Sequence, residues 1–207
     1  MMKPLFITGI GTDIGKTIVS AVLVEKLQAD YWKPVQSGDL DNSDTMKVKR
    51  LVSNNFSVFH PEAYRLTQPF SPHKSAELDG LEIAIEQIII PATNRQLIIE
   101  GAGGLMVPLN NRGDMIIDLI KKLDAEVVLV SKNYLGSINH TLLSIDVLEN
   151  RGIKIKTIVF NGQADNYSED IIKAHFKGDM PSIIHIPHLA GEINKALILQ
   201  QAAYIEL

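Results

Sequence analysis

The chain contains no cysteine among its 207 residues. Without thiols it can form neither disulfides nor thiolate metal sites, and a cysteine nucleophile is excluded as well. An ATP-dependent amide-forming enzyme that draws ammonia from glutamine through a cysteine glutaminase could not hold that module in this chain. Any nitrogen that such an enzyme incorporated would come with the substrate or from solution.

Long hydrophobic runs and basic clusters are also scarce. The apolar stretch at residues 5–7 is too short for a signal-peptide core or a membrane span. The net charge is −4, and the one basic run, at residues 47–50, fits a solvated helix face better than a nucleic-acid-binding surface. We therefore expect a cytoplasmic protein that binds neither membranes nor nucleic acid.

The composition that remains is ordinary for a globular protein. Hydrophobic residues make up 45% of the chain and charged residues 21%, which favours neither disorder nor a fibrous repeat. A chain of 207 residues is long enough to bury one sizeable core. Because no repeat, low-complexity tract or linker interrupts it, we expect a single domain over residues 1–207.

Short apolar runs rich in β-branched residues recur along the chain, which is typical of strands buried on both faces of a parallel sheet. Helix-period segments lie between them, including one behind a candidate N-cap at Asp114 and one that begins near Ser137 and ends at Gly152. This alternation predicts an α/β fold with helices on both faces of the sheet. The predicted strands are residues 5–8, 31–35, 97–99, 126–131, 154–160 and 183–186. Residues 39–77 are the least regular, and we expect them to form loops over the mouth of a site.

The first predicted strand leads directly into the sequence GIGTDIGKT at residues 9–17, and an amphipathic helix follows. A phosphate-binding loop needs this context: backbone N–H groups at a helix start cradle the phosphates, Lys16 reaches the outer phosphates, and the Thr17 hydroxyl binds magnesium. Five residues separate Gly9 from Gly15, one more than the standard motif has. The alternative is a glycine-rich turn without a ligand, but a strand and a helix in the required places favour the phosphate loop.

Two carboxylates are candidate magnesium ligands. Glu100 follows the predicted strand 97–99, and the carboxyl ends of parallel strands face the ligand crevice. Its alternative role is to cap the turn made by the glycine-rich residues 101–104. Asp44, in the sequence NSDT, is either a ligand or the N-cap of a helix.

Two further features need support from elsewhere in the chain. Lys33 comes at the end of the predicted second strand, where its ammonium group either reaches the same crevice or lies on the surface. The segment 134–140 opens a helix whose free N–H groups could bind an anion, although an ordinary helix start is the simpler interpretation.

Taken together, the ordered motifs resemble the dethiobiotin synthetase family over nearly the whole chain. The motifs are GIGTDIGKT at 9–17, KPV with SG at 33–38, SD at 43–44, SPH at 71–73, EGAGG at 100–104 and GSINH at 136–140. The resemblance implies a single-domain, P-loop NTPase-like, mononucleotide-binding fold. It also implies a homodimer with shared active sites that forms dethiobiotin from 7,8-diaminopelargonic acid, CO2 and ATP. The absence of cysteine agrees with this, because both nitrogens arrive on the substrate.

The resemblance also implies a role for individual residues. It places Mg²⁺ on Thr17, Asp44 and Glu100, and it makes Lys16 and Lys33 catalytic, with Lys33 beside the carbamate. Nucleotide contacts are implied at Asp13, Ile14, Gly15, Lys16, Thr17, Ile18, Asp44, Glu100, Gly101, Ala102 and Gly103, and around the base at Asn161, Gly162, Pro187, His188 and Leu189. Substrate contacts are implied at Thr12, Ser37, Gly136, Ser137 and Asn139, the last three from the second subunit. Lys173 is the nearest equivalent of a family tyrosine that meets the substrate carboxylate.

Other classes of protein remain as alternatives at this point. A partition or cell-division ATPase shares the fold, but it carries a signature lysine five residues before the loop lysine, and Gly11 stands there. A cobyrinic-acid-type amidoligase is typically fused to a cysteine glutaminase. A nucleotide-binding scaffold without turnover would leave Glu100 and Lys33 without a role.

Overall fold

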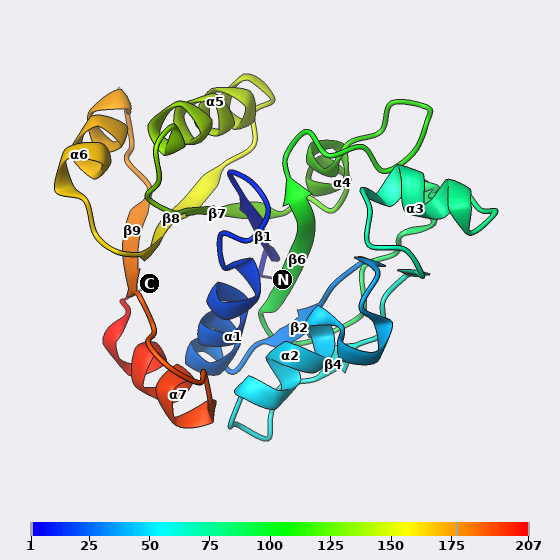
Figure 1. The fold of residues 1–207 in the computed structure, drawn as a ribbon, viewed down its shortest axis with the longest axis horizontal. Helices are drawn as coiled ribbons and strands as arrows, with labels where there is room; N and C mark the ends of the chain where they lie inside the picture. Colours follow the sequence, from blue (N-terminus) through cyan, green and yellow to red (C-terminus); the bar gives the residue numbers. More distant parts are fainter. Residues whose placement is uncertain (1, 177, 207) are drawn as a thin grey trace.

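The computed structural model describes residues 2–176 and 178–206. A seven-stranded sheet with the order β4-β2-β6-β1-β7-β8-β9 runs through the molecule (Figure 1). Every pair of neighbouring strands in it is parallel, as the sequence predicts. The strands are β1 (Leu5–Gly9), β2 (Asp30–Trp32), β4 (Phe59–His60), β6 (Leu97–Gly104), β7 (Glu126–Ser131), β8 (Ile155–Gly162) and β9 (Ser182–Pro187). A separate parallel pair is formed by β3 (Val35–Ser37) and β5 (Tyr64–Leu66).

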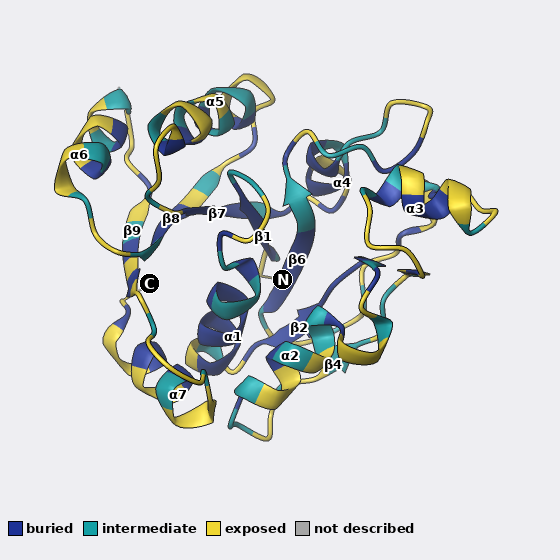
Figure 2. Cartoon of the chain, viewed as in Figure 1, coloured by how far each residue is buried: buried dark blue, intermediate teal, exposed yellow. Residues whose placement is uncertain are grey.

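Helices cover both faces of the main sheet, which confirms the predicted α/β class (Figure 1). Alternate residues of β1 belong to two different apolar clusters, Phe6 to one and its neighbours Leu5 and Ile7 to the other, because successive side chains of a strand point to opposite faces. Figure 2 shows the buried strands between helices with exposed outer sides. The helices are α1 (Lys16–Leu27), α2 (Asp44–Leu51), α3 (Pro72–Leu78), α4 (Ile116–Lys122), α5 (Ser137–Asn150), α6 (Asn166–His175) and α7 (Lys195–Tyr204), with 3₁₀ turns η1 (Leu40–Asn42) and η2 (Ile85–Gln87).

The strand order sets the position of the site. Strand β1 lies between β6 and β7, and the chain passes from β1 to β2 on one side before it reaches β7 on the other. In open parallel sheets such a reversal of strand order leaves a crevice at the carboxyl ends of the strands. The segments that follow β1, β2 and β6 therefore meet at one edge of the sheet.

The prediction of a single strand over residues 31–35 is wrong. The chain leaves the main sheet after Trp32, and Val35–Ser37 pairs with β5 instead. Pro34 lies at the break, and proline has no N–H group to donate to a sheet ladder. The break leaves Lys33 just beyond the carboxyl end of β2.

Two other local predictions need correction. Asp114 is not the N-cap of α4, because the helix begins at Ile116, and the Asp114 carboxylate instead accepts a hydrogen bond from Asn110 at 2.6 Å. Residues 39–77 are not mainly loops, since they contain η1, α2, β4, β5 and α3. Helix α5 does end before Gly152, whose φ of 64° lies in the left-handed region, as predicted. No helix in the described part of the chain is long and apolar enough to cross a membrane.

Candidate active site

The loop between β1 and α1 has the backbone of a phosphate cradle. Asp13 and Gly15 both adopt positive φ angles, 56° and 95°, and Gly15 is the last residue before α1. A Cβ atom on Gly15 would lie 2.0 Å from the side-chain amide nitrogen of Asn161, so a larger residue there would strain the backbone and displace that amide. That same Asn161 amide donates a hydrogen bond to the Ile14 carbonyl at 2.7 Å, which ties the end of β8 to the loop.

Lys16 begins α1 and lines the cavity in front of the loop. Its ammonium group donates a hydrogen bond to the Gly11 carbonyl at 2.9 Å, so the side chain folds back along the loop. Burial lowers the pKa of Lys16, and the nearby Glu100 carboxylate opposes that shift. The Lys16 ammonium group thus lies against the loop, beside the cavity that Thr17 also lines.

Glu100 is the centre of a buried cluster of polar groups. It lies within β6, its exposed fraction is 1%, and it accepts three hydrogen bonds. The Thr17 hydroxyl donates to Oε1 at 3.0 Å, the Lys33 ammonium to Oε1 at 3.3 Å, and the Tyr31 hydroxyl to Oε2 at 3.0 Å. These partners come from α1 and from the end of β2, so Glu100 joins these two elements to β6. The strand does not end at residue 99 as expected, because residues 101–104 continue β6 and form no turn for Glu100 to cap.

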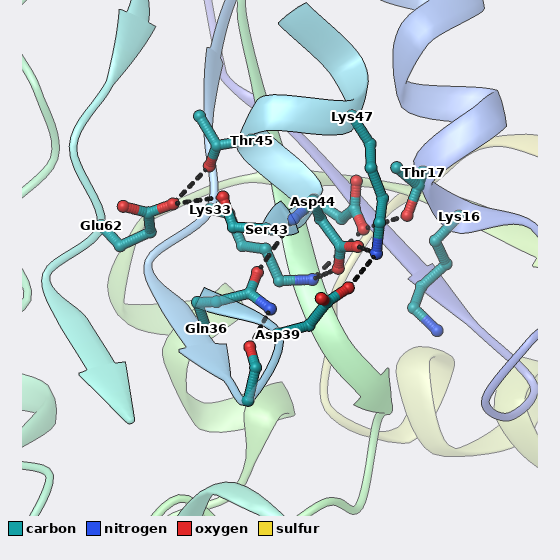
Figure 3. A network of polar contacts seen from close by, with 12 residues as sticks. Lys16, Thr17, Lys33, Gln36, Asp39, Ser43, Asp44, Thr45, Lys47 and Glu62 are labelled. Atoms are coloured by element: carbon teal, nitrogen blue, oxygen red, sulfur yellow. Dashed lines mark hydrogen bonds and ion pairs between the residues drawn. The ribbon is translucent and has the colours of Figure 1, made fainter. Parts of the chain in front are cut away.

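Lys33 lies between the two carboxylates that the sequence singles out. It forms ion pairs with both Asp44 and Glu100, and Figure 3 shows the pair with Asp44. Burial opposes the charge on Lys33, but the attraction of Glu100 and then of Asp44 outweighs it and raises the pKa of the ammonium group. Burial likewise opposes the charge on Asp44, yet Lys33 and Lys47 together lower the pKa of its carboxyl group. The surface alternative for Lys33 is excluded by its exposed fraction of 5%.

The start of α2 fixes Asp44. Ser43 is the N-cap, because its hydroxyl accepts a hydrogen bond from the Met46 N–H at 3.3 Å, and Asp44 is the first residue of the helix. The cap alternative for Asp44 is therefore wrong. The buried Gln36 side chain accepts from the Asp44 N–H at 3.2 Å and donates to the Gly38 carbonyl at 2.9 Å (Figure 3).

A cavity of about 610 Å³ collects these groups. The predicted site residues that line it are Thr12, Asp13, Gly15, Lys16, Thr17, Lys33, Ser37, Asp44, Glu100, Ala102 and Gly103. Residues 69–72 and Val107 also line it, so part of the segment expected over the mouth does lie there. The Ser37 hydroxyl is buried without a hydrogen-bond partner among the described residues.

The remaining predicted residues lie elsewhere. Gly136 and Asn139 line a separate cavity at the start of α5, and Ser137 is buried beside them. Asn161 and Gly162 pair with Ile186 and Pro187 in the sheet, so the residues predicted to surround the base are neighbours, with His188 and Leu189 following directly. Ile14 is buried under the loop, and Gly101 is buried in β6. Ile18, on α1, is partly buried against the same apolar cluster as Ile14. Lys173, on α6, pairs with Glu169 and Asp170.

The oxygen atoms around Lys33 fit a magnesium ion. Thr17, Asp44 and Glu100 offer a hydroxyl and two carboxylates, which are the hard ligands that Mg²⁺ prefers. No set of three His, Asp or Glu ligands gathers in the described part of the chain. The metal would therefore complete its coordination with water and nucleotide phosphates, as Mg²⁺ commonly does.

Sequence reasoning missed three residues of this site: Tyr31, Gln36 and Lys47. Tyr31 stands two positions before Lys33, and strand alternation predicts that both point to the same side. That signal could have identified Tyr31. Gln36 and Lys47 give no comparable signal, because their roles depend on how α2 is placed against β3.

Comparisons with known proteins agree with this geometry. A family model described as an AAA domain matches residues 3–197. A protein of Christiangramia forsetii named ATP-dependent dethiobiotin synthetase is 57% identical over 84% of this chain and 83% of its own. One from Cytophaga hutchinsonii with the same name is 54% identical over 84% of each chain, and one from Rhodopseudomonas palustris is 44% identical over 95% of this chain and 92% of its own.

Solved structures with a similar fold are more distant in sequence. A ParA family ATPase from Chlorobium tepidum aligns with a TM-score of 0.58 at 14% identity, covering 99% of this chain and 100% of its own. The MinC:MinD cell division complex of Aquifex aeolicus aligns with a TM-score of 0.57 at 14% identity, and the alignment covers 97% of this chain and 86% of the matched chain. These likenesses show the P-loop NTPase-like fold alone, whereas the sequence relatives share most of the chain at high identity. The chain therefore belongs to the dethiobiotin synthetase family.

Proposed function

We propose that this protein closes the ureido ring of dethiobiotin from 7,8-diaminopelargonic acid and CO2, with ATP converted to ADP and phosphate. The observation that carries the proposal is the convergence of Lys16, Thr17, Lys33, Asp44 and Glu100 on one cavity behind a phosphate loop. A loop for the nucleotide and a buried ammonium group for the second reactant thus face the same space.

The first step forms a carbamate. The lone pair of one substrate amine attacks the carbon of CO2, a C–N bond forms, and the amine releases a proton. The Lys33 ammonium would stabilise the carbamate anion, and a nearby positive charge also favours the neutral, nucleophilic form of the amine. The unpartnered Ser37 hydroxyl offers a hydrogen bond to the carbamate or to the diamine.

The second step transfers a phosphoryl group. A carbamate oxygen attacks the γ-phosphorus of ATP, ADP leaves, and a carbamic-phosphoric anhydride results. Lys16 would offset negative charge on the transferring group, and the backbone N–H groups of the loop would hold the other phosphates. Mg²⁺ held by Thr17, Asp44 and Glu100 would supply charge neutralisation and orientation of the phosphates.

The third step closes the ring. The second amine attacks the carbonyl carbon of the anhydride, its C–N bond forms as the C–O bond to phosphate breaks, and the attacking nitrogen loses a proton to the departing phosphate or to water. Both nitrogens come from the diamine, which agrees with a chain that has no cysteine for a glutaminase. We place the reaction in the cytoplasm, where ATP is available.

We further propose that two copies of the chain share each active site. The amides at Gly136–Asn139, expected to bind the substrate carboxylate, do not line the phosphate-loop cavity of their own chain. Apolar side chains nearby are exposed, among them Met106, Leu135 and Leu143. A second copy that covered them would bring its own α5 start to the site.

The test is a product assay with the purified protein, ATP, Mg²⁺, bicarbonate and the diamine. We expect dethiobiotin by mass spectrometry, with one phosphate released per ring closed, and no phosphate release when either the diamine or bicarbonate is left out. Lys16→Ala, folded as judged by circular dichroism, should release no phosphate. Steady ATP hydrolysis without the diamine, and no dethiobiotin with it, would instead support a switch ATPase.

A further inference from the structure

Tyr31 places a polar group at the centre of the site, and the mechanism above gives it no role. Its side chain is completely buried in β2, and its hydroxyl donates a hydrogen bond to Glu100 Oε2 at 3.0 Å. The ring packs beside that of Phe59, 6.0 Å away from centroid to centroid, and phenylalanine would keep the ring in this contact because it differs only by the hydroxyl. The hydroxyl is therefore not needed to fill the core.

The two oxygens of Glu100 have different surroundings. Oε1 accepts from Thr17 and Lys33, on the side of the cavity, whereas Tyr31 is the partner of Oε2 within the described residues. The carboxylate is 1% exposed, so water does not replace a lost partner easily. Without the phenol, Oε2 would be a buried anionic oxygen without a hydrogen bond, and the group would gain by turning both oxygens toward Lys33.

We infer that Tyr31 is a positioning residue that orients Glu100, so that Oε1 faces Thr17 and the place of the metal ion. The inference rests on the proposed function, because it assumes that Glu100 is a metal ligand. Partners that orient metal-binding side chains commonly change metal affinity by roughly 10- to 100-fold when they are removed. Tyr31→Phe should therefore weaken metal binding while it leaves the packing of the ring intact.

The experiment measures Mn²⁺ binding by electron paramagnetic resonance, with the enzyme saturated by a non-hydrolysable ATP analogue and no diamine present. We expect the Kd for Mn²⁺ to rise at least about tenfold in Tyr31→Phe. Tyr64→Phe is the matched control, since that hydroxyl accepts from the Ala84 N–H at 3.1 Å and has no contact with the metal ligands in the described structure. Its Kd for Mn²⁺ should equal that of the wild type.

A double-mutant cycle makes the test specific. If Tyr31 acts through Glu100, then Tyr31→Phe in a Glu100→Gln background should weaken Mn²⁺ binding no further. Three results would overturn the inference and leave the proposed reaction intact. They are an unchanged Kd for Mn²⁺ in Tyr31→Phe, a rise in Kd that is as large in the Glu100→Gln background as in the wild type, and failure of Tyr31→Phe to fold. A wild type that forms dethiobiotin but binds no Mn²⁺ at this site would overturn the metal assignment and the inference with it.

Discussion

At the scale of single residues, Lys33 is the side chain on which most of the site depends. Its ammonium group is buried between two carboxylates that are expected to hold a metal ion. It balances their charge in the structure, and under the proposed reaction the same positive charge would stabilise the carbamate.

Lys33→Met tests both roles. Removing one partner of a buried ion pair costs about 3–5 kcal/mol, so the free energy of unfolding should fall by that order in metal-free buffer. Mg²⁺ with ATP should then raise the melting temperature more than it does in the wild type, because it restores positive charge between Asp44 and Glu100. Nucleotide binding by calorimetry should persist, while dethiobiotin formation is lost.

Lys47→Met is the matched control. Lys47 also pairs with Asp44, at 3.4 Å, but its side chain is 33% exposed, and such pairs contribute about 0–1 kcal/mol. Its free energy of unfolding should stay near that of the wild type. If Lys33→Met proves as stable as Lys47→Met, the buried ammonium does not balance the two carboxylates.

The lowered pKa of Asp44 predicts a pH dependence of stability. Since the folded pKa lies below the unfolded value of about 3.9, the group contributes stability above that value and loses it as the pH falls through the folded pKa. In metal-free buffer, the difference in unfolding free energy between wild type and Asp44→Asn should be constant near neutral pH. It should shrink below about pH 4. The exposed Asp41→Asn variant should have nearly the unfolding free energy of the wild type throughout. If the difference between wild type and Asp44→Asn grew in acid, folding would raise the pKa of Asp44 instead of lowering it.

At the scale of elements, two short features bring the polar groups together. The break between β2 and β3 at Pro34 directs Lys33 into the crevice. The N-terminus of α2 then presents Asp44, and it is held by the Ser43 cap, by the Gln36 side chain, and by Glu62, which accepts from the Thr45 hydroxyl at 2.7 Å. The position of Asp44 therefore depends on how well this helix start is fixed.

Ser43→Ala tests that dependence. Loss of a serine N-cap costs about 1 kcal/mol of stability, and here it should also raise the Mg²⁺ concentration needed for half-maximal turnover. Asn194→Ala removes a cap of the same kind from α7, away from the cavity, where the side chain accepts from the Leu197 N–H at 3.1 Å. It should lose similar stability without any change in the magnesium titration. Equal titrations for both variants would show that the cap does not position Asp44.

At the scale of the whole molecule, the proposed sharing of each active site by two chains predicts complementation between two inactive variants. Lys33→Met removes the ammonium group proposed to stabilise the carbamate in the phosphate-loop cavity. Asn139→Glu places a negative charge where the exposed start of α5 would receive the substrate carboxylate. Asn139 suits this better than the buried Ser137, where a larger side chain would threaten the fold itself. Each variant alone should be inactive.

Mixing the two variants with exchange of subunits should restore activity. Random exchange makes about half of the dimers mixed, and each mixed dimer has one site with both lesions and one site with neither. Total activity should then be roughly a quarter of the wild type. Light scattering and native mass spectrometry would establish the dimer and the exchange. Proven exchange without recovered activity would show that each site lies within one chain.

The amino-acid sequence alone determined the class of fold and the phosphate loop. Strand runs, helix periods and the segment GIGTDIGKT are local patterns, and they correctly predicted the parallel sheet, both covered faces and the neighbourhood of Lys16, Thr17 and Glu100. Glu100 was predictable because the carboxyl ends of parallel strands face the crevice by rule, whatever the side chains are.

Only the tertiary structure decided which side chains touch. The bonds from Tyr31 and Lys33 to Glu100 join positions 69 and 67 residues apart, and that from Thr17 joins positions 83 apart. No local pattern records the sheet register or the packing of α2 that produces such contacts. For that reason the strand break at Pro34 and the cap at Ser43 escaped prediction, although each depends on a residue whose local chemistry is plain. The chemistry of proline, serine and tyrosine can be read from the sequence, but the packing of distant segments decides which groups these residues contact.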